Sequence, residues 1–346
     1  MNSRTDILSL LNGNKLSAPP AFSGLIHVTE KGLASEGLTL REVHHDAGKI
    51  ARAAASTFKS TGIPSATLPL DLCLPAELLG AELDFASEGF PQVKKAVFDS
   101  VKDLATESTE NLRIGRIAGE RLETERLETG RLGIGLEAIR LVKQDIGAEV
   151  VISGMIPGPY TLLLYLCNPK NLFIEMKREP QAVLDALFHL SSFLARIGNA
   201  CREAGADFIT IHDMGGSPGF IGPAKYEQFV LPSEKDLIER LPSPRVLSVC
   251  GNVSKSLGLL NQTGAEAISL DQTVNLAEAR AALTDAMLFG NLDPVALLSK
   301  GEEAEVGEAV QRSKEAGVDA VWPGCDLVPS TPLGNIRAMV EGASHL

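Results

Sequence analysis

The chain has 346 residues, 44% of them hydrophobic, which is enough for two average domains or for one (β/α) barrel with a large core. Its 44 acidic residues outnumber 32 basic ones, and the net charge of −12 argues against a protein that must neutralise the phosphates of nucleic acid. The start of the chain lacks the apolar run of a signal peptide, no segment approaches the length of a membrane span, and the five cysteines are scattered. We therefore expect a cytoplasmic protein with reduced thiols, and neither a nucleic-acid nor a membrane partner.

The first predicted element is a short helix within residues 1–18. Asp6 to Leu11 is mostly apolar, Gly13 ends the pattern, and two prolines follow at positions 19 and 20. We expect this N-terminal helical extension to pack across one end of the fold.

Eight short apolar runs then alternate with longer helical patterns. They are residues 20–26, 66–71, 149–154, 207–213, 245–250, 266–271, 286–291 and 319–323. Strands that alternate with helices pair in parallel, and eight such units close into a barrel rather than an open sheet. The sequence thus predicts an α/β fold, a single (β/α)8 TIM barrel domain over residues 1–346.

Residues 108–133 form a charged excursion from this pattern. Arg-Leu recurs at positions 121, 126 and 131. A step of five residues turns an ideal helix by about 140 degrees, so these leucines cannot share one face. We expect a solvent-exposed segment here.

The predicted strands end in residues with chemical function. In order these are His27, Asp71, Gly154 followed by Gly158 and Pro159, His212 with Asp213, Cys250, Asp271, Asn291 and Cys325. In a parallel barrel the carboxyl ends of all strands meet at one mouth, where such folds keep their active sites. One face is therefore expected to hold thiols, imidazoles and carboxylates together.

Cys250 and Cys325 are the strongest candidates for chemistry. They are 75 residues apart, which is not a zinc-finger spacing, and two buried structural cysteines are the alternative. Each, however, stands beside a glycine at a strand end, where a thiolate can reach a ligand. Zinc held by two thiolates and one nitrogen or carboxylate, with its fourth position open, would suit activation of a thiol.

The neighbouring strand end carries His212 and Asp213. His212 either hydrogen-bonds within the mouth or serves as a metal ligand, and Asp213 either orients it or caps the next segment. The loop with Gly158 and Pro159 is either a rigid turn or one wall of a pocket. It matches no nucleotide-binding fingerprint.

Several motifs together resemble the uroporphyrinogen decarboxylase superfamily, and within it the methylcobalamin:coenzyme M methyltransferase branch. The resemblance covers nearly the whole chain, and its motifs are residues 71–80, 158–161, 217–223, 250–252, 290–294 and, most specifically, 323–335. We accordingly predict two groups of site residues at the mouth. The catalytic group is Cys250, Cys325, Asp213 and Asp271, and the cofactor-binding group is Asp71, Gly158, Pro159 and Asn291.

The resemblance also implies a zinc site, with one departure. Members of this branch bind zinc through a His-x-Cys pair and a later Cys, which correspond here to Ser248, Cys250 and Cys325, so the imidazole is missing. A serine hydroxyl is a poor zinc ligand. Either another group completes the site, with His212 first and Asp271 next, or zinc binds weakly or only with the thiol, or thiol activation has been lost.

The activity that the resemblance implies is methyl transfer. Zinc would hold a coenzyme M-like thiol as thiolate, and the thiolate would take the methyl group from methyl-Co(III) of a corrinoid, leaving Co(I). No corrinoid-binding Asp-x-His-x-x-Gly motif occurs in the sequence, so the methylcorrinoid would come from a partner corrinoid protein.

Two other activities remain open at this point. One is methyl transfer to or from tetrahydrofolate without thiol activation. The other is a uroporphyrinogen-type decarboxylase, which is less favoured because no arginine lies between Arg4 and Arg41 to hold the carboxylates of the porphyrin.

Overall fold

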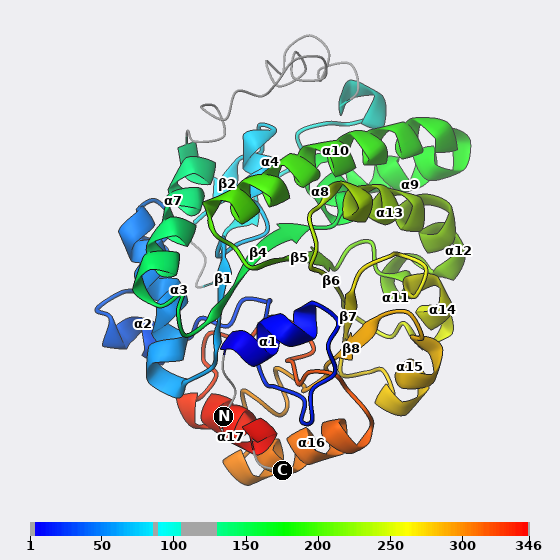
Figure 1. Ribbon diagram of the computed structural model, residues 1–346. Helices are drawn as coiled ribbons and strands as arrows, with labels where there is room; N and C mark the ends of the chain where they lie inside the picture. The colour runs from blue at the N-terminus through cyan, green and yellow to red at the C-terminus, as the bar shows by residue number, and fades with distance from the viewer. Residues whose placement is uncertain (1–3, 86–88, 105–129, 345–346) are drawn as a thin grey trace.

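The centre of the molecule is a parallel sheet of six strands in the order β1-β4-β5-β6-β7-β8. The computed structural model describes residues 4–85, 89–104 and 130–344. The strands are β1 Ser65–Leu68, β4 Val151–Pro157, β5 Phe208–Asp213, β6 Arg245–Val249, β7 Ala267–Leu270 and β8 Met287–Phe289. Consecutive strands lie side by side with helices around them, as in an α/β TIM barrel (Figure 1).

Two of the eight predicted strands were wrong as regular strands. Residues 20–26 and 319–323 contribute isolated parallel bridges, such as Ala21 with Val321, instead of ladders. Pro20 and Pro323 have no amide hydrogen, and Gly24 interrupts the first segment, so the ladder is broken there. The two segments still complete the wall, because the Val321 amide donates to the Pro20 carbonyl at 2.9 Å.

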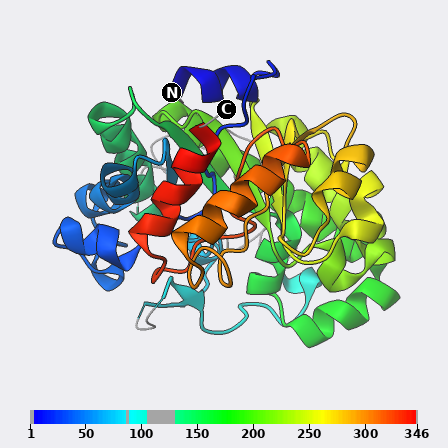
Figure 2. The same cartoon turned by 90° about the horizontal axis from the view of Figure 1, so that it is seen from below.

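Helices form the outer layer. They are α2 Glu30–Ser35, η1 Leu40–Glu42, α3 Ala47–Thr61, α4 Leu74–Leu78, α7 Gly130–Asp145, α8 Pro159–Leu166, α9 Pro169–Arg178, α10 Pro180–Ala204, α11 Pro218–Ile221, α12 Pro223–Lys225, the π-helix η3 Tyr226–Val230, α13 Leu231–Arg240, η4 Ser254–Ser256, α14 Leu257–Leu260, α15 Leu276–Ala282, α16 Glu303–Glu315 and α17 Leu333–Ser344. The last two pack along each other (Figure 2). Each of the longer helices buries one apolar face against the strands or its neighbours.

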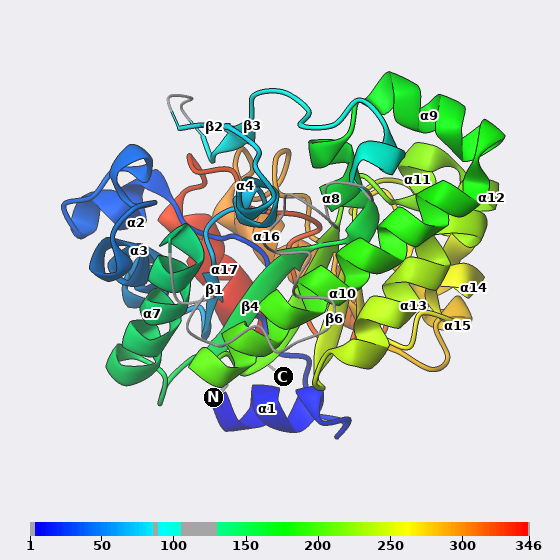
Figure 3. The ribbon, with the colours of Figure 1, turned by 90° about the horizontal axis from the view of Figure 1, so that it is seen from above.

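The predicted N-terminal helix lies across the end of the barrel at which the strands begin. This helix, α1 Arg4–Leu11, buries Ile7, Leu10 and Leu11 against an aromatic cluster (Figures 1 and 2). The cluster is made of Phe22, Phe208, Phe289 and Trp322, with Phe22 and Trp322 packed edge to face at 5.2 Å. A small hairpin of β2 Leu83–Asp84 and β3 Gln92–Val93 lies at the opposite end, where the mouth is (Figure 3).

The inward-facing residues change in character from one end of the barrel to the other. On β5 they run from Phe208 through Thr210 to His212, and on β6 from Val246 through Ser248 to Cys250 just beyond the strand. The middle level is polar, since the hydroxyls of Ser153 and Thr210 lie 2.8 Å apart. An apolar floor therefore supports a polar level, and the reactive groups lie above both.

The charged excursion predicted at 108–133 falls mostly outside the described residues, except that residues 130–133 begin α7. Within the described residues, no helix combines the length and apolarity that a membrane crossing requires. The single-domain boundary and the cytoplasmic location stay predictions.

Candidate metal centre

The two cysteines at the mouth meet although they are far apart in sequence. Cys250 directly follows β6, and Cys325 follows the wall segment 319–323. Their Sγ atoms are 3.1 Å apart, and both residues are free thiols that are partly exposed. The sulfurs thus face each other at a surface that a ligand can reach, so two separately buried structural cysteines are excluded.

His212 completes a group of three metal-binding side chains. Its Nε2 atom lies 3.8 Å from the Cys325 Sγ, and the ligand atoms of His212, Cys250 and Cys325 all lie within 4.8 Å of one another. His212 is opposite Ser248 in the register of β5 and β6. The imidazole therefore stands one strand away from position 248, at the same level of the barrel.

The charges in this group are arranged around Cys325. The contact with Cys250, supported by His212 and opposed by burial, lowers the pKa of Cys325 below that of an ordinary thiol. The same contact, together with burial, raises the pKa of the Cys250 thiol. These opposite shifts favour a Cys325 thiolate beside a Cys250 thiol.

Asp326 adds a negative charge beside the imidazole. Its Oδ2 lies 3.8 Å from His212 Nε2, and burial raises the pKa of this carboxyl group to about 6. Burial alone would lower the pKa of His212, but Asp326 and the Cys325 thiolate outweigh it and raise that pKa to about 9. The sequence offered one signal for Asp326, its place directly after Cys325, and our prediction missed it.

The donor set is suitable for zinc. Two thiolates bound to one zinc ion at about 2.3 Å lie about 3.8 Å apart, so the sulfurs need to open by about 0.7 Å from their 3.1 Å separation. His212 Nδ1 and Ser248 Oγ are buried without a hydrogen-bond partner among the described groups. Because Nε2 faces the sulfurs, it is the ring atom placed to bind a cation.

Asp271 and Asn291 support the turn that carries Cys250. Asp271 Oδ2 accepts from the Gly251 amide at 2.8 Å, and Asn291 Nδ2 donates to the Asp271 carbonyl at 2.9 Å. Neither side chain belongs to the group of three. In the structure these two predicted site residues position the Cys250 loop.

Asp213 and Gly158 form a second support, behind His212. Asp213 is fully buried and accepts from the Thr161 hydroxyl at 2.5 Å. A Cβ atom at Gly158 would lie 2.2 Å from the Asp213 carboxyl carbon, so only glycine allows this approach. Pro159, also buried, starts α8. The structure does not bring these residues to the sulfurs.

The remaining predicted residue, Asp71, faces a separate part of the mouth. It is buried and paired with Arg131 at 2.9 Å. It lines a cavity of about 410 Å³ with Tyr165, Met214 and Asp326. Because Asp326 lines this cavity and also lies 3.8 Å from His212 Nε2, the cavity is next to the group of three metal-binding side chains.

Comparison with known proteins agrees with this geometry. The family model for uroporphyrinogen decarboxylase (URO-D) matches residues 2–346. The chain belongs to this family. Among its curated relatives, the methylcobamide:CoM methyltransferase MtbA of Methanosarcina acetivorans is 32% identical over 94% of this chain and 93% of its own length.

Other members of the family are similar at lower identity. The uroporphyrinogen decarboxylase of a Geobacter species is 29% identical over 82% of this chain and 81% of its own length. Among solved structures, a methyltransferase from Methanosarcina mazei superposes with a TM-score of 0.88 at 25% identity, covering 98% of this chain and 97% of the other. The chain is thus a methyltransferase of the URO-D family.

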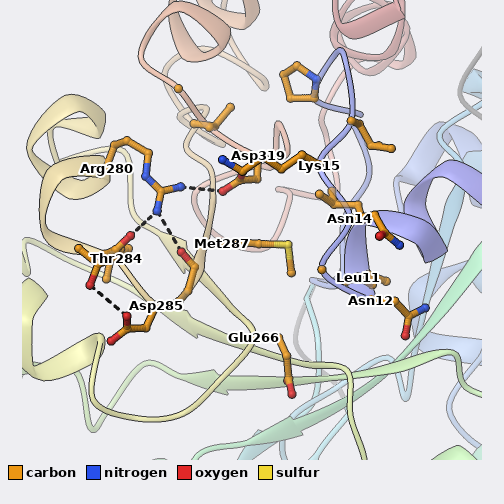
Figure 4. A pocket seen from close by; sticks show the side chains of 18 of the residues that line it. Leu11, Asn12, Asn14, Lys15, Glu266, Arg280, Thr284, Asp285, Met287 and Asp319 are labelled. Carbon is orange, nitrogen blue, oxygen red and sulfur yellow. Dashed lines mark hydrogen bonds and ion pairs between the residues drawn. The ribbon is translucent and has the colours of Figure 1, made fainter.

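A larger cavity, of about 780 Å³, lies at the other end of the barrel beside α1 (Figure 4). Arg280 lines it and pairs with Asp319 at 2.7 Å, and Lys15, Glu266 and Asp285 also line it. Active sites of TIM barrels lie at the carboxyl ends of the strands. The size of this cavity is therefore no argument for placing the chemistry of this URO-D member there.

Proposed function

We propose that the chain moves a methyl group between a methylcorrinoid, carried by a partner protein, and a thiol activated on a zinc ion. His212, Cys250 and Cys325 would hold the ion, and the fourth position would take the thiol of the acceptor. Zinc in such a site lowers the pKa of a bound thiol, so that the acceptor is a thiolate at neutral pH. The observation that supports the proposal is the convergence of these three side chains at the mouth.

The transfer itself needs no covalent intermediate on the protein. The sulfur of the acceptor attacks the methyl carbon, a C–S bond forms, and the electron pair of the Co–C bond stays on cobalt as Co(III) becomes Co(I). The proton of the acceptor thiol is lost before the attack. The protein's part is to hold the sulfur, to limit water around it and to leave an open side from which the methyl carbon can approach.

His212 replaces the imidazole expected at position 248 in this proposal. Both residues point into the barrel from neighbouring strands and are paired in register. His212 can therefore serve the ion that the family resemblance would assign to a histidine at 248. This arrangement corresponds to the first of the three possibilities that the sequence left open.

The test combines metal analysis with an assay of methylcobalamin demethylation. Purified protein is expected to contain about one zinc per chain and to demethylate methylcobalamin with coenzyme M, the methyl acceptor in the names of the relatives. Cys250→Ser and Cys325→Ser should lose zinc and activity together. Homocysteine and tetrahydrofolate are the alternative acceptors, and uroporphyrinogen is the alternative substrate.

The possible outcomes distinguish the proposed activity from the two alternative activities. Activity with tetrahydrofolate in both cysteine variants would show methyl transfer without thiol activation. Release of carbon dioxide from uroporphyrinogen would show a decarboxylase. Protein that contains no zinc and keeps its methyl transfer after both substitutions would contradict the proposal.

A further inference from the structure

Few large apolar side chains of the described residues are exposed, and two of them lie on loops that contact the cysteine-bearing turns. Within the described residues, six large apolar side chains are exposed, and the most exposed is Phe220 at 64%. Val295 is next, at 45%. The others are Val97, Phe173, Ile174 and Phe188.

Phe220 is on the loop that is attached to the Cys250 turn. It belongs to α11, which follows β5, and the Ser217 hydroxyl at the start of this helix donates to the Cys250 carbonyl at 2.5 Å. Two residues further, a Cβ atom at Gly219 would lie 2.9 Å from the Asn252 carbonyl oxygen. The loops touch with no space for another side chain, and Phe220 is the next residue.

Val295 has a similar relation to the Cys325 loop. The Gly324 amide, next to Cys325, donates to the Leu292 carbonyl at 2.7 Å, and Val295 follows three residues later. Its own amide is held by the Asp293 carboxylate at 2.8 Å, so the loop has a fixed shape. Each sulfur-bearing loop is thus joined to a loop with an exposed apolar side chain.

We propose that Phe220 and Val295 form the contact surface for the corrin ring of the methyl donor, a proposal that rests on the function proposed above. A corrin is a broad, flat macrocycle, and its methyl carbon must approach the metal-bound sulfur in line with the Co–C bond. When it does so, the edge of the ring lies over the loops next to the sulfurs. Apolar side chains there gain by losing contact with water, and an aromatic ring can also pack against the macrocycle.

The direct test is equilibrium dialysis of the zinc-loaded protein with free methylcobalamin, together with the KM for methylcobalamin at saturating thiol. Phe220→Ala is expected to weaken binding by roughly 5- to 20-fold, the loss of a partly buried aromatic contact. Val295→Ala should weaken it by about 2- to 5-fold on the same grounds. The KM for the thiol, the zinc content and kcat at saturating methylcobalamin should stay unchanged.

Phe188→Ala is the matched control. It removes the same kind of side chain, 38% exposed, from α10 in the outer helical layer, and it should not change methylcobalamin binding. Phe220→Trp should restore binding close to that of the natural protein, because it restores an aromatic face. Such rescue separates a contact with the ligand from a general effect on the loop.

Two negative results can be told apart. If the natural protein transfers methyl groups but Phe220→Ala binds methylcobalamin as tightly as Phe188→Ala does, the contact surface is wrong and the proposed function remains. If the natural protein transfers no methyl group to any acceptor, the proposed function is wrong. The dialysis then decides separately whether a corrinoid binds at Phe220.

Discussion

At the scale of single residues, the position of the imidazole can be tested by moving it. His212→Ala is expected to weaken zinc binding by at least about 100-fold, because it removes one of the three proposed ligands. Adding Ser248→His to this variant should recover much of the loss, since the two positions are paired on adjacent strands. Zinc affinity is measured by competition with a chromophoric chelator.

Ser248→Ala is the control for this exchange. The Ser248 hydroxyl has no hydrogen-bond partner among the described groups, so its removal should leave zinc affinity unchanged. A large loss of zinc in this variant would mean that the serine itself belongs to the site. Failure of the histidine at 248 to recover any affinity would contradict the idea that the two positions are equivalent.

At the scale of elements, a buried pair of acids joins the π-helix and α13 to the end of β5. The Tyr226 hydroxyl donates to Glu234, and Glu234 in turn meets Asp213, the residue after His212. Burial and the charge of Asp213 raise the pKa of Glu234 well above its usual value. The raised pKa favours the neutral acid form of Glu234, which is the form that can donate a proton to Asp213.

Stability should depend on this proton. As pH rises above the ordinary carboxyl range, the unfolded chain ionises Glu234 while the folded chain keeps it neutral, so the free energy of unfolding falls until the raised pKa is reached. Glu234→Gln removes this contribution and should make stability less dependent on pH. Chemical denaturation between pH 5 and pH 9 would measure the difference.

Glu234→Ala is the contrasting variant. It leaves the Tyr226 hydroxyl and Asp213 buried without their partner and should cost about 2 kcal/mol in the free energy of unfolding. Equal losses in the glutamine and alanine variants, with no change in pH dependence, would show that Glu234 is not held as a neutral donor.

The helix α1 gives a second prediction at this scale. Ile7 is fully buried against the aromatic cluster at the floor of the barrel, so Ile7→Ala should lower the free energy of unfolding by about 2–4 kcal/mol. Lys15→Ala, just beyond the helix, should have little effect. Because the cluster lies at the end opposite the sulfurs, zinc content is expected to be normal in both variants below their unfolding transitions.

At the scale of the whole molecule, the barrel and the meeting of the cysteines could be predicted because both follow from topology. Parallel strands place their carboxyl ends together whatever their separation in sequence, and this brought Cys250 to Cys325. The number of regular strands was overestimated, because apolar composition does not reveal whether prolines leave enough amide donors for a ladder.

The details of the site were less accessible from sequence. The pairing of His212 with Ser248 depends on strand register, which is set by contacts between distant segments. The sequence placed Asp213 and Asp271 at the mouth. It could not show that the Asp213 carboxylate accepts a hydrogen bond from Thr161 and the Asp271 carboxylate one from the Gly251 amide. Asp326 was missed since only the fold shows that its carboxylate turns toward His212.

The wall segment of residues 20–26 makes the barrel uneven around its circumference. It is linked to β1 through side chains, with the Ser23 amide donating to the Ser65 hydroxyl at 2.9 Å, while β4 and β5 share a full ladder. Amide deuterium uptake should accordingly be faster in residues 20–26 than in the regular strands of the barrel. The Ile26 amide also donates to Asp326 at 2.7 Å, so this least-bonded part of the wall is directly attached to the residue that follows Cys325.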